Sequence, residues 1–300
     1  MSGPVAVTRA TVVEVGPRDG LQNESVHLDP ATRAAFVDAL AAAGLPVIEV
    51  AAFVSPRWVP QMADAAEVVR RLTPRPGIRY TALVPNLQGL ADALDAGVRE
   101  VAIFAAASET FSQRNINSDI ARSLATYAEV VRRAHDAGAR VRAYLSTAFG
   151  CPYEGPVPIE RVVDISERLA LMGVFQTAIS DTIGIAHPGQ VWELVGALVA
   201  RMPVESLALH FHDTRGTALA NVLAGLQCGV TTFDSSAGGL GGCPYAPGAA
   251  GNLATEDLIY MLDGLGVATG VDLHAVVAAS RLIESKIGHP LPSRYLQAQR

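Results

Sequence analysis

Short apolar runs rich in β-branched residues recur along the whole chain, and glycine, proline or polar residues bound each of them. Runs of this length and composition are typical of buried strands. The pattern predicts eight strands, at Thr11–Val15, Val47–Phe53, Arg79–Val84, Glu100–Ala106, Val141–Thr147, Phe175–Asp181, Leu207–Asp213 and Thr231–Ser235.

Longer segments with apolar residues at helical spacing lie between these strands. The helices predicted from them are Ala31–Ala43, Ser118–Ala137, Ile159–Met172, Pro188–Met202 and Thr217–Cys228. A glycine stands where four of them should end, at Gly44, Gly138, Gly173 and Gly229. Glycine suits the left-handed residue that closes many helices. Strand and helix alternate roughly every 30 residues, which is the rhythm of a (β/α)8 TIM barrel, an α/β fold.

The chain of 300 residues has the length that a single barrel of this kind takes. A doubly wound open sheet is the alternative, but it normally uses fewer strands, and no Gly-x-Gly-x-x-Gly opens a helix after the first strand. Two further helices, Thr255–Leu265 and Leu273–Ser285, are predicted before a polar tail. No linker is evident. We therefore predict one domain over residues 1–300, with the barrel at about 11–250 and additional C-terminal helices at about 255–290.

Composition excludes several classes of protein. Half of the residues are hydrophobic and 17% are charged, so the chain is not intrinsically disordered. No uninterrupted apolar run is long enough to span a membrane, and a net charge of −6 argues against a nucleic-acid partner. Lys286 is the one lysine, so a Walker phosphate loop is excluded, and Schiff-base chemistry would depend on that residue.

The three cysteines, Cys151, Cys228 and Cys243, lie far apart in the sequence. They exclude a disulfide framework and a Cys-x-x-Cys site, and they suit a reducing compartment. The first residues lack the apolar core of a signal peptide, and the first predicted strand begins at Thr11, which leaves no room for a transit peptide. We therefore expect a cytoplasmic protein.

Two histidines end the seventh predicted strand, and the functional groups of a TIM barrel gather at this end of its strands. The spacing of His210 and His212 points both imidazoles to the same face of a strand. Such a pair is a common half of a metal site, since neutral imidazole binds divalent ions. A pair of histidines held by ordinary hydrogen bonds is the alternative.

Asp19 and Asn252 can approach the same histidine pair. Asp19 follows the first predicted strand and Asn252 the eighth, and in a closed barrel only the eighth strand separates the first from the seventh. One carboxylate, one amide oxygen and two imidazoles would leave positions for substrate oxygens. This donor set suits Mg²⁺ or Mn²⁺ better than a structural zinc. For Asn252, an N-cap of the following helix is the alternative.

Other charged side chains occupy the same end of the predicted barrel. Arg18 either stabilises an enolate oxygen or forms a salt bridge with a neighbouring carboxylate. Glu49 and Asp181 lie in otherwise apolar strands, where an unpaired charge is costly. At least one of these two carboxylates should therefore face the site or Arg18.

A glycine-rich segment, Gly238–Tyr245 (GGLGGCPY), surrounds one thiol after the eighth predicted strand. A flexible surface loop is the default interpretation. Such a loop can also close over a substrate and deliver a proton-transfer group, and Cys243 would be that group. We interpret Cys151 as structural and Cys228, at a helix end, as part of the core.

Six motifs of this chain resemble those of hydroxymethylglutaryl-CoA lyases, which belong to a superfamily of barrel metallolyases with isopropylmalate and homocitrate synthases. The motifs are Gly16–Glu24 (GPRDGLQNE), Phe53–Met62 (FVSPRWVPQM), Gly150–Gly155 (GCPYEG), Asp181–Gly184 (DTIG), His210–Thr214 (HFHDT) and Leu240–Leu258 (LGGCPYAPGAAGNLATEDL). The resemblance extends over about residues 12–270, and several of its motifs are long enough to be highly specific.

The resemblance implies a role for each candidate residue. The implied ligands of a divalent metal, Mg²⁺ or Mn²⁺, are Asp19, His210, His212 and Asn252. Arg18 is the implied enolate-stabilising cation and, with Gln22, a substrate-binding residue. Cys243 is the implied proton donor of the loop, and Glu49 and Asp181 are implied carboxylates of the active site.

The reaction implied by the resemblance is the retro-Claisen cleavage of 3-hydroxy-3-methylglutaryl-CoA to acetyl-CoA and acetoacetate, a step of leucine catabolism. A related branched 3-hydroxyacyl-CoA is an alternative substrate. Acyl transfer of the isopropylmalate or homocitrate synthase kind and a catalytically silent scaffold are alternative functions. The expected partners are an acyl-CoA thioester and a second copy of the chain in a homodimer, with neither nucleic acid nor membrane.

Three sites depart from the usual motifs of the resembled family. Ala51 and Ala52 stand where hydroxyl residues usually follow the second-strand glutamate. Arg215 replaces an aromatic residue after the histidine motif, and Ala237 replaces a valine before the loop motif. We therefore expect the substrate pocket beside Glu49 to be wider and less polar than usual, and we still rank the methyl-substituted C6 substrate first.

Overall fold

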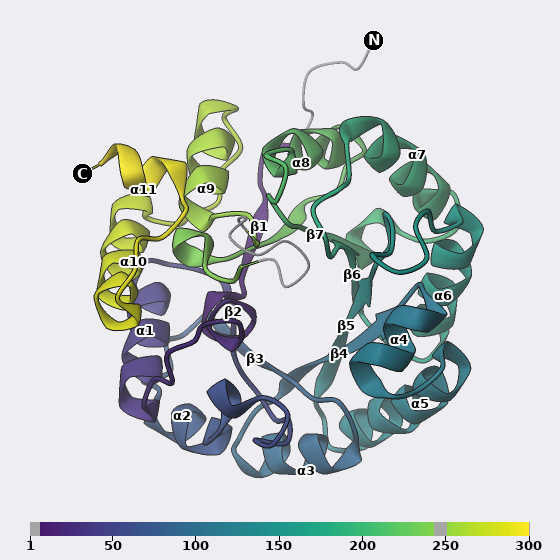
Figure 1. The fold of residues 1–300 in the computed structure, drawn as a ribbon, viewed down its shortest axis with the longest axis horizontal. Coiled ribbons are helices and arrows are strands. Elements are labelled where there is room, and N and C mark those ends of the chain that lie inside the picture. The colour runs from purple at the N-terminus through teal and green to yellow at the C-terminus, as the bar shows by residue number, and fades with distance from the viewer. Residues whose placement is uncertain (1–6, 243–250, 300) are drawn as a thin grey trace.

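The computed structural model describes residues 7–242 and 251–299 of the chain. Within them, eight parallel strands close into a barrel in which each strand pairs with the next and β8 pairs with β1 (Figure 1). The strands are β1 (Thr11–Glu14), β2 (Val47–Ala52), β3 (Arg79–Leu83), β4 (Glu100–Ala106), β5 (Arg140–Ser146), β6 (Gln176–Asp181), β7 (Leu207–Phe211) and β8 (Thr232–Ser235). Each predicted strand is present, and the closure confirms the TIM barrel and excludes the open sheet.

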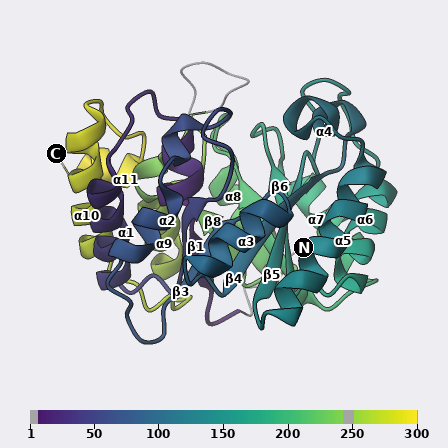
Figure 2. The same ribbon diagram turned by 90° about the horizontal axis from the view of Figure 1, so that it is seen from below.

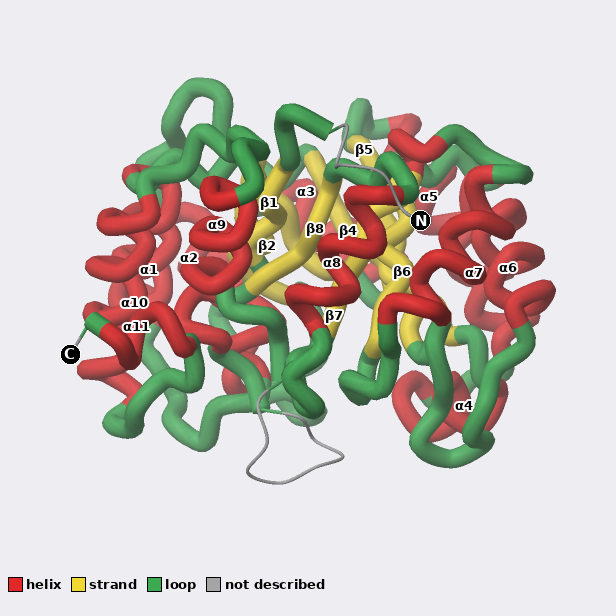
Figure 3. The backbone as a smooth tube through the Cα atoms, turned by 90° about the horizontal axis from the view of Figure 1, so that it is seen from above, coloured by secondary structure: helices red, strands yellow, loops and turns green. Residues whose placement is uncertain are grey.

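A ring of helices surrounds the strands (Figure 1), and the view from the side shows the strands enclosed between helices (Figure 3). The helices between the strands are α1 (Pro30–Ala42), α2 (Ala65–Arg71), α3 (Leu87–Asp95), α4 (Glu109–Ile116), α5 (Ile120–Asp136), α6 (Ile159–Leu171), α7 (Pro188–Val199) and α8 (Ala218–Gln227). The sequence pattern missed α2, α3 and α4, which have only 7, 9 and 8 residues and are too short to show a clear helical period. Figure 2 shows α4 at one end of the barrel, apart from the ring.

Three helices follow the barrel: α9 (Thr255–Gly264), α10 (Leu273–Ile287) and α11 (Arg294–Ala298). The first two were predicted, and the third is a short addition. They lie together on one side of the ring (Figure 1), where α10 packs against α1 and α9 packs against α8. The additional C-terminal helices therefore cover the part of the barrel where β1 and β8 meet. Within the two described ranges, no helix is long and apolar enough to span a membrane.

The strand β7, which carries His210 and ends just before His212, packs closely against its covering helix. Gly225 of α8 allows this approach, because a Cβ atom at that position would lie 2.4 Å from Cδ1 of Leu209 and 3.2 Å from the ring of Phe233. Contacts of this length cannot be relieved without moving the helix or the strands. The glycine thus fixes α8 against β7 and β8, just below the end of the barrel to which His210 belongs.

A buried ion pair crosses the interior of the barrel. Arg142 of β5 donates from both terminal nitrogens to the carboxylate of Asp234 on β8, at 2.6 and 3.3 Å. Both residues are only 2% exposed. The same carboxylate contacts Nδ1 of His210 at 3.2 Å. The ion pair therefore joins two strands that are not neighbours in the barrel, beside the ring of His210. Either charge would be costly to bury without its partner.

Replacing Arg142 should therefore destabilise the barrel much more than replacing an exposed arginine. We expect Arg142→Met to lower the free energy of unfolding by about 3–5 kcal/mol, because Asp234 is left buried without its cation. Arg201→Met is the matched control, since Arg201 pairs with Glu167 at the surface and should contribute less than about 1 kcal/mol. Urea unfolding followed by far-UV circular dichroism measures both. Equal losses would contradict the importance of the interior ion pair.

Candidate metal centre and active site

The turn after β1 presents Arg18 and Asp19 at the mouth of the barrel. The amides of Arg18, Asp19 and Gly20 all donate to the carbonyl oxygen of Val15, at 3.1, 2.7 and 3.2 Å. The result is a single π-helical turn over Gly16–Gly20. Turns of this kind are rare and occur frequently at functional sites. Here the turn places a cation and a carboxylate side by side in the chain.

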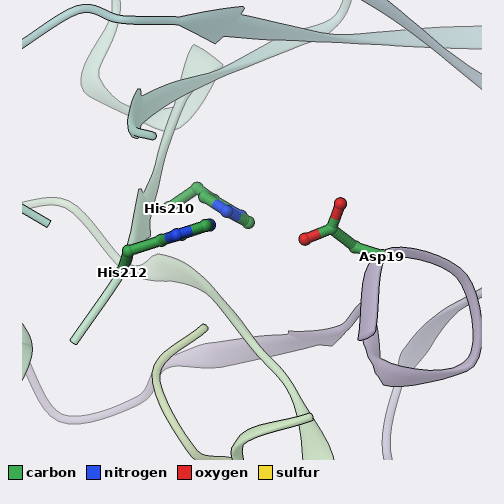
Figure 4. A group of neighbouring side chains, drawn as sticks. All are labelled: Asp19, His210 and His212. Atoms are coloured by element: carbon green, nitrogen blue, oxygen red, sulfur yellow. The ribbon is translucent and has the colours of Figure 1, made fainter. Parts of the chain in front are cut away.

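Asp19 lies opposite the two histidines. Figure 4 shows the rings of His210 and His212 pointing from one side and the Asp19 carboxylate from the other toward a common space. One donor atom from each of the three residues lies within 4.8 Å of the others. The structure therefore brings together the three metal ligands that the sequence pattern suggested from segments far apart in the chain.

The Asp234 carboxylate orients the imidazole of His210. Its Nδ1 contacts the Asp234 carboxylate at 3.2 Å, which leaves Nε2 as the remaining donor atom. A carboxylate behind a histidine is the usual means of orienting a metal ligand. Nδ1 of His212 is buried and has no hydrogen-bond partner in the described part of the chain. The alternative of two histidines held only by ordinary hydrogen bonds therefore does not account for His212.

Asn252 points its side chain into the same site. Its Nδ2 donates to Oδ2 of Asp19 at 2.9 Å and to the carbonyl oxygen of Leu240 at 3.2 Å. Its Oδ1 is buried without a partner among the described residues, and leaving such an oxygen unsatisfied is costly. The N-cap alternative is wrong, since the N-cap of α9 is Ala254 and no side chain caps that helix.

The protonation states of Asp19 and His212 favour the binding of a metal cation. Burial raises the pKa of Asp19, but the Arg18 guanidinium, with His210 and His212, more than offsets it and lowers this pKa to about 2. Burial, together with His210, lowers the pKa of His212 to about 4. Near neutral pH the first is therefore an anion and the second a neutral imidazole, the forms that bind divalent metals. Together with the free Oδ1 of Asn252, these residues fit Mg²⁺ or Mn²⁺.

Arg18 is held between two carboxylates. Its Nε donates to Oε2 of Glu49 at 2.5 Å, and its Nη1 donates to Oδ1 of Asp19 at 2.6 Å. The Tyr144 hydroxyl donates to the same oxygen of Glu49 at 3.1 Å, and the guanidinium lies 5.3 Å from the centre of the Tyr144 ring. The expectation that a strand carboxylate faces Arg18 is met by Glu49. Gln22, a few residues further along, is half-buried.

Asp181, at the end of β6, holds the turn that follows its own strand. Its two oxygens accept the amides of Ile185 and Ala186 at 3.0 and 2.9 Å. Burial raises the pKa of Asp181, although both amides work in the opposite direction. A carboxylate with a raised pKa is a better proton acceptor than an ordinary one. Its role in the reaction stays a prediction.

Arg215, one of the departures from the usual motifs, lies between β7 and α8, which begins at Ala218. It donates to the carbonyl oxygens of Ile183 and Gly184 at 2.9 and 3.0 Å.

The expectation of a wider pocket beside Glu49 needs correction. Ala51 and Ala52, at the end of β2, are both 0% exposed. Neither side chain borders open space in the described structure. Ala237 is also buried, at the start of the turn after β8.

The three cysteines have different surroundings. Cys243 lies outside the described residues, so its predicted place in the loop is not tested. Cys151 is buried, with its Sγ 2.9 Å from the hydroxyl oxygen of Ser108, in agreement with a structural role. Cys228 is half-buried at the end of α8 and packs against the core.

Sequence reasoning missed the residues that surround these side chains. Tyr144 contacts Glu49 and Arg18, and Asp234 contacts His210. Arg142 lies behind them and contacts both Asp234 and the ring of Tyr144. The sequence does contain a signal for these residues. Polar residues stand at alternate positions of two predicted strands, at Arg142 and Tyr144 in one and at Thr232 and Asp234 in the other. Period-two alternation of this kind places such residues on one face of a strand.

Comparison with known proteins agrees with this geometry. The family model described as HMGL-like matches residues 9–283. The chain belongs to the HMGL-like family. As a member of this family it is a metal-dependent carbon–carbon lyase.

The HMGL-like relatives match along nearly the whole chain. A 3-hydroxy-3-isohexenylglutaryl-CoA/hydroxymethylglutaryl-CoA lyase of Pseudomonas aeruginosa is 50% identical, over 97% of each chain. The crystal structure of an HMG-CoA lyase of Bacillus subtilis superposes with a TM-score of 0.97 at 48% identity, over 99% of each chain. An HMG-CoA lyase of Acinetobacter baumannii, in complex with coenzyme A and 3-methylmalate, is 37% identical with a TM-score of 0.93, over 97% of this chain and 95% of that one.

The metal site of this HMGL-like chain can be tested by removing one imidazole. We expect His212→Ala to weaken Mn²⁺ binding at least tenfold, measured by isothermal titration calorimetry on chelator-treated protein, because a neutral donor is lost from the group. The far-UV circular dichroism should not change. His274→Ala, which removes an exposed imidazole at the start of α10, is the control. Unchanged Mn²⁺ affinity in His212→Ala would refute the site.

Proposed function

We propose that this HMGL-like enzyme cleaves 3-hydroxy-3-methylglutaryl-CoA to acetyl-CoA and acetoacetate. The observation that carries the proposal is the convergence of Asp19, His210, His212 and Asn252 with Arg18 at one end of the barrel. Relatives that match nearly the whole chain carry the name of this activity, which supports the choice of substrate.

Four residues would hold the metal: Asp19, His210, His212 and Asn252. A bound Mg²⁺ or Mn²⁺ supplies Lewis acidity toward the tertiary hydroxyl and the free carboxylate of the substrate. Asp19 brings the negative charge of this group, and the imidazoles bring neutral donors. His210 keeps its orientation through Asp234, so that its donor atom stays aimed at the site.

The chain's own residues account for the movement of protons and electrons. Asp181, whose pKa is raised by burial, takes the proton of the tertiary hydroxyl. The bond between C2 and C3 then breaks, its electron pair passing to C2, and the hydroxyl carbon becomes the ketone of acetoacetate. Arg18 stabilises the enolate oxygen of the acetyl-CoA fragment. Cys243 gives a proton to C2 of that enolate, which completes acetyl-CoA.

Arg18 is suited to this task by the way it is held. Glu49 and Asp19 each accept one of its hydrogen bonds, so the guanidinium keeps a fixed direction before substrate arrives. A preoriented cation stabilises developing charge without a reorganisation cost during the reaction. Gln22 is the proposed further contact with the substrate.

The proposed partner is an acyl-CoA thioester. A relative of 37% identity has been solved in complex with coenzyme A and 3-methylmalate, which supports a thioester substrate for this chain. We also propose a cytoplasmic homodimer that acts in leucine catabolism, and an organisation as one catalytic domain.

A product assay tests the proposed function directly. Metal-free enzyme supplied with Mg²⁺ or Mn²⁺ should convert 3-hydroxy-3-methylglutaryl-CoA to equal amounts of acetyl-CoA and acetoacetate, and chelator should stop the reaction. A synthase would instead release free coenzyme A from acetyl-CoA and a 2-keto acid. Release of coenzyme A without cleavage of the hydroxyacyl thioester would favour that alternative.

The thiol of Cys243 should matter for turnover and not for substrate binding. We expect Cys243→Ser to lower kcat by about 10²-fold or more, the usual scale for a positioned acid or base, with KM little changed. Cys228→Ser is the control, since this half-buried thiol should affect stability alone. Equal loss of kcat in both variants would remove the reason for giving the loop thiol a role.

A larger 3-alkyl substrate is the second candidate. The name of the Pseudomonas aeruginosa relative includes a 3-isohexenyl substrate, and each added methylene gains about 0.8 kcal/mol if it is buried. We nevertheless expect kcat/KM to be highest for the 3-methyl compound, because Ala51 and Ala52 border no open space in this structure. Measuring kcat/KM over a 3-alkyl series for the native chain and Ala52→Ser tests the order. If the native chain prefers long 3-alkyl groups and Ala52→Ser abolishes that preference, the wider pocket beside Glu49 would be supported after all.

A further inference from the structure

Two glutamates lie buried beneath the turn that follows β8, and no step of the proposed reaction uses either of them. Glu14 ends β1 and Glu256 lies in the first turn of α9, and both are 0% exposed. Burial raises the pKa of each to about 7. Neither carboxylate has a cation beside it in the described part of the chain. A buried carboxylate in that position is costly to the fold unless hydrogen bonds satisfy it.

Glu14 joins three segments of the chain through one carboxylate. Its Oε1 accepts the amides of Gly16 at 2.8 Å and Ala237 at 2.9 Å, and its Oε2 accepts the Thr255 hydroxyl at 2.6 Å. The first amide belongs to the turn of Arg18, and the second belongs to the turn after β8. The hydroxyl begins α9, a few residues after the metal-site asparagine.

Glu256 holds the next amide of the same turn. Its two oxygens accept the Gly238 amide at 3.1 and 2.8 Å, and one of them also accepts the hydroxyl of Ser280 in α10. Gly238 has a φ of 67°, and a Cβ atom there would lie 2.3 Å from Cδ1 of Leu291. Two successive amides of the turn Ala237–Gly239 are thus each bound to a separate buried carboxylate.

This turn packs directly against the catalytic end of β1. A Cβ atom at Gly16 would lie 3.3 Å from the amide nitrogen of Ala237, and one at Gly20 would lie 2.7 Å from Cβ of Leu240, the residue that follows the turn. The carbonyl oxygen of Leu240 accepts a hydrogen bond from Asn252, which also donates to Asp19. A shift of the turn would therefore move two metal-site residues.

We propose that Glu14 and Glu256 are positioning residues for the lyase reaction: they hold the turn after β8 against the turn after β1. Together they set the relative places of Arg18, Asp19 and Asn252. A misplacement of about 1 Å among reacting groups can cost on the order of 10²-fold in rate. The inference rests on the proposed function, but its effect on the metal site can be measured without that reaction.

Glu14→Asp is the decisive variant, because it keeps the charge but withdraws the carboxylate by one methylene. The shorter side chain cannot reach Ala237 and Thr255 at once. We expect kcat at saturating Mn²⁺ to fall at least tenfold while KM changes less than threefold. We expect the Kd of Mn²⁺, measured by calorimetry on metal-free protein, to rise at least fivefold.

Glu100→Asp is the matched control. Glu100 is also buried, but it pairs with Arg79 at the opposite end of the barrel, where β4 begins. The same shortening there should lower Tm without changing kcat or Mn²⁺ affinity. If Glu14→Asp lowers Tm as Glu100→Asp does and leaves kcat and Mn²⁺ affinity intact, Glu14 is merely structural and the proposal fails.

Glu14→Gln should keep most of the native kcat and Mn²⁺ affinity, because its amide oxygen can accept both backbone amides while its NH₂ donates to Thr255. Losses as large as those of Glu14→Asp would contradict positioning by these hydrogen bonds. If Glu14→Asp does not fold, Thr255→Val removes one of the three bonds with little change of shape. It should then weaken Mn²⁺ binding about threefold, and an unchanged affinity would overturn the proposal.

The two proposals fail separately. If the native chain does not cleave 3-hydroxy-3-methylglutaryl-CoA, the proposed function falls. The ratio of Mn²⁺ affinities between Glu14→Asp and Glu100→Asp then still tests the positioning role. If the native chain cleaves this substrate and that ratio is one, only the positioning role falls.

Discussion

The pairing of β8 with β1 is the constraint on which the site depends. The register aligns Thr11 with Thr232 and continues to Glu14 and Ser235, so the two strands end at the same level. The segments that follow them must then emerge side by side, although more than two hundred positions separate them in the chain. Asp19 and Asn252 belong to these two segments, and their hydrogen bond is a direct product of closure.

Charge inside this barrel is arranged in alternating order. Glu49, Arg18 and Asp19 follow one another by ion pairs across the mouth, and Arg142 and Asp234 repeat the pattern one layer below. Each cation has a carboxylate partner, which reduces the cost of burial. The two histidines lie where the upper group and the lower group meet, so that a divalent ion would bring the positive charge that this point still lacks.

Much of the fold could be predicted from the sequence because its periodic signals are strong. All eight strands were found, with ends that differ by two residues at most. The short helix α2 was not found, because its seven residues follow an Asp64 in the left-handed conformation and begin without a side-chain cap. Such a start depends on contacts from the rest of the molecule, which local sequence does not encode.

The candidate site could be predicted from the sequence only in part. The spacing of His210 and His212 predicts that both rings lie on the same face of a strand, and closure of the barrel brings Asp19 close to them. Asn252 was ambiguous, since only its tertiary contacts distinguish a ligand from an N-cap. The contacts of Arg215 with the carbonyl oxygens of Ile183 and Gly184 were not predicted. Such hydrogen bonds across the fold leave no trace in the spacing of residues.

The ion pair between Arg142 and Asp234 has a consequence for the histidines above it. The Asp234 carboxylate binds Arg142 and also contacts Nδ1 of His210, so the same group serves the interior of the barrel and its mouth. A substitution at Arg142, below the site, would therefore also disturb the side chain that orients one candidate metal ligand.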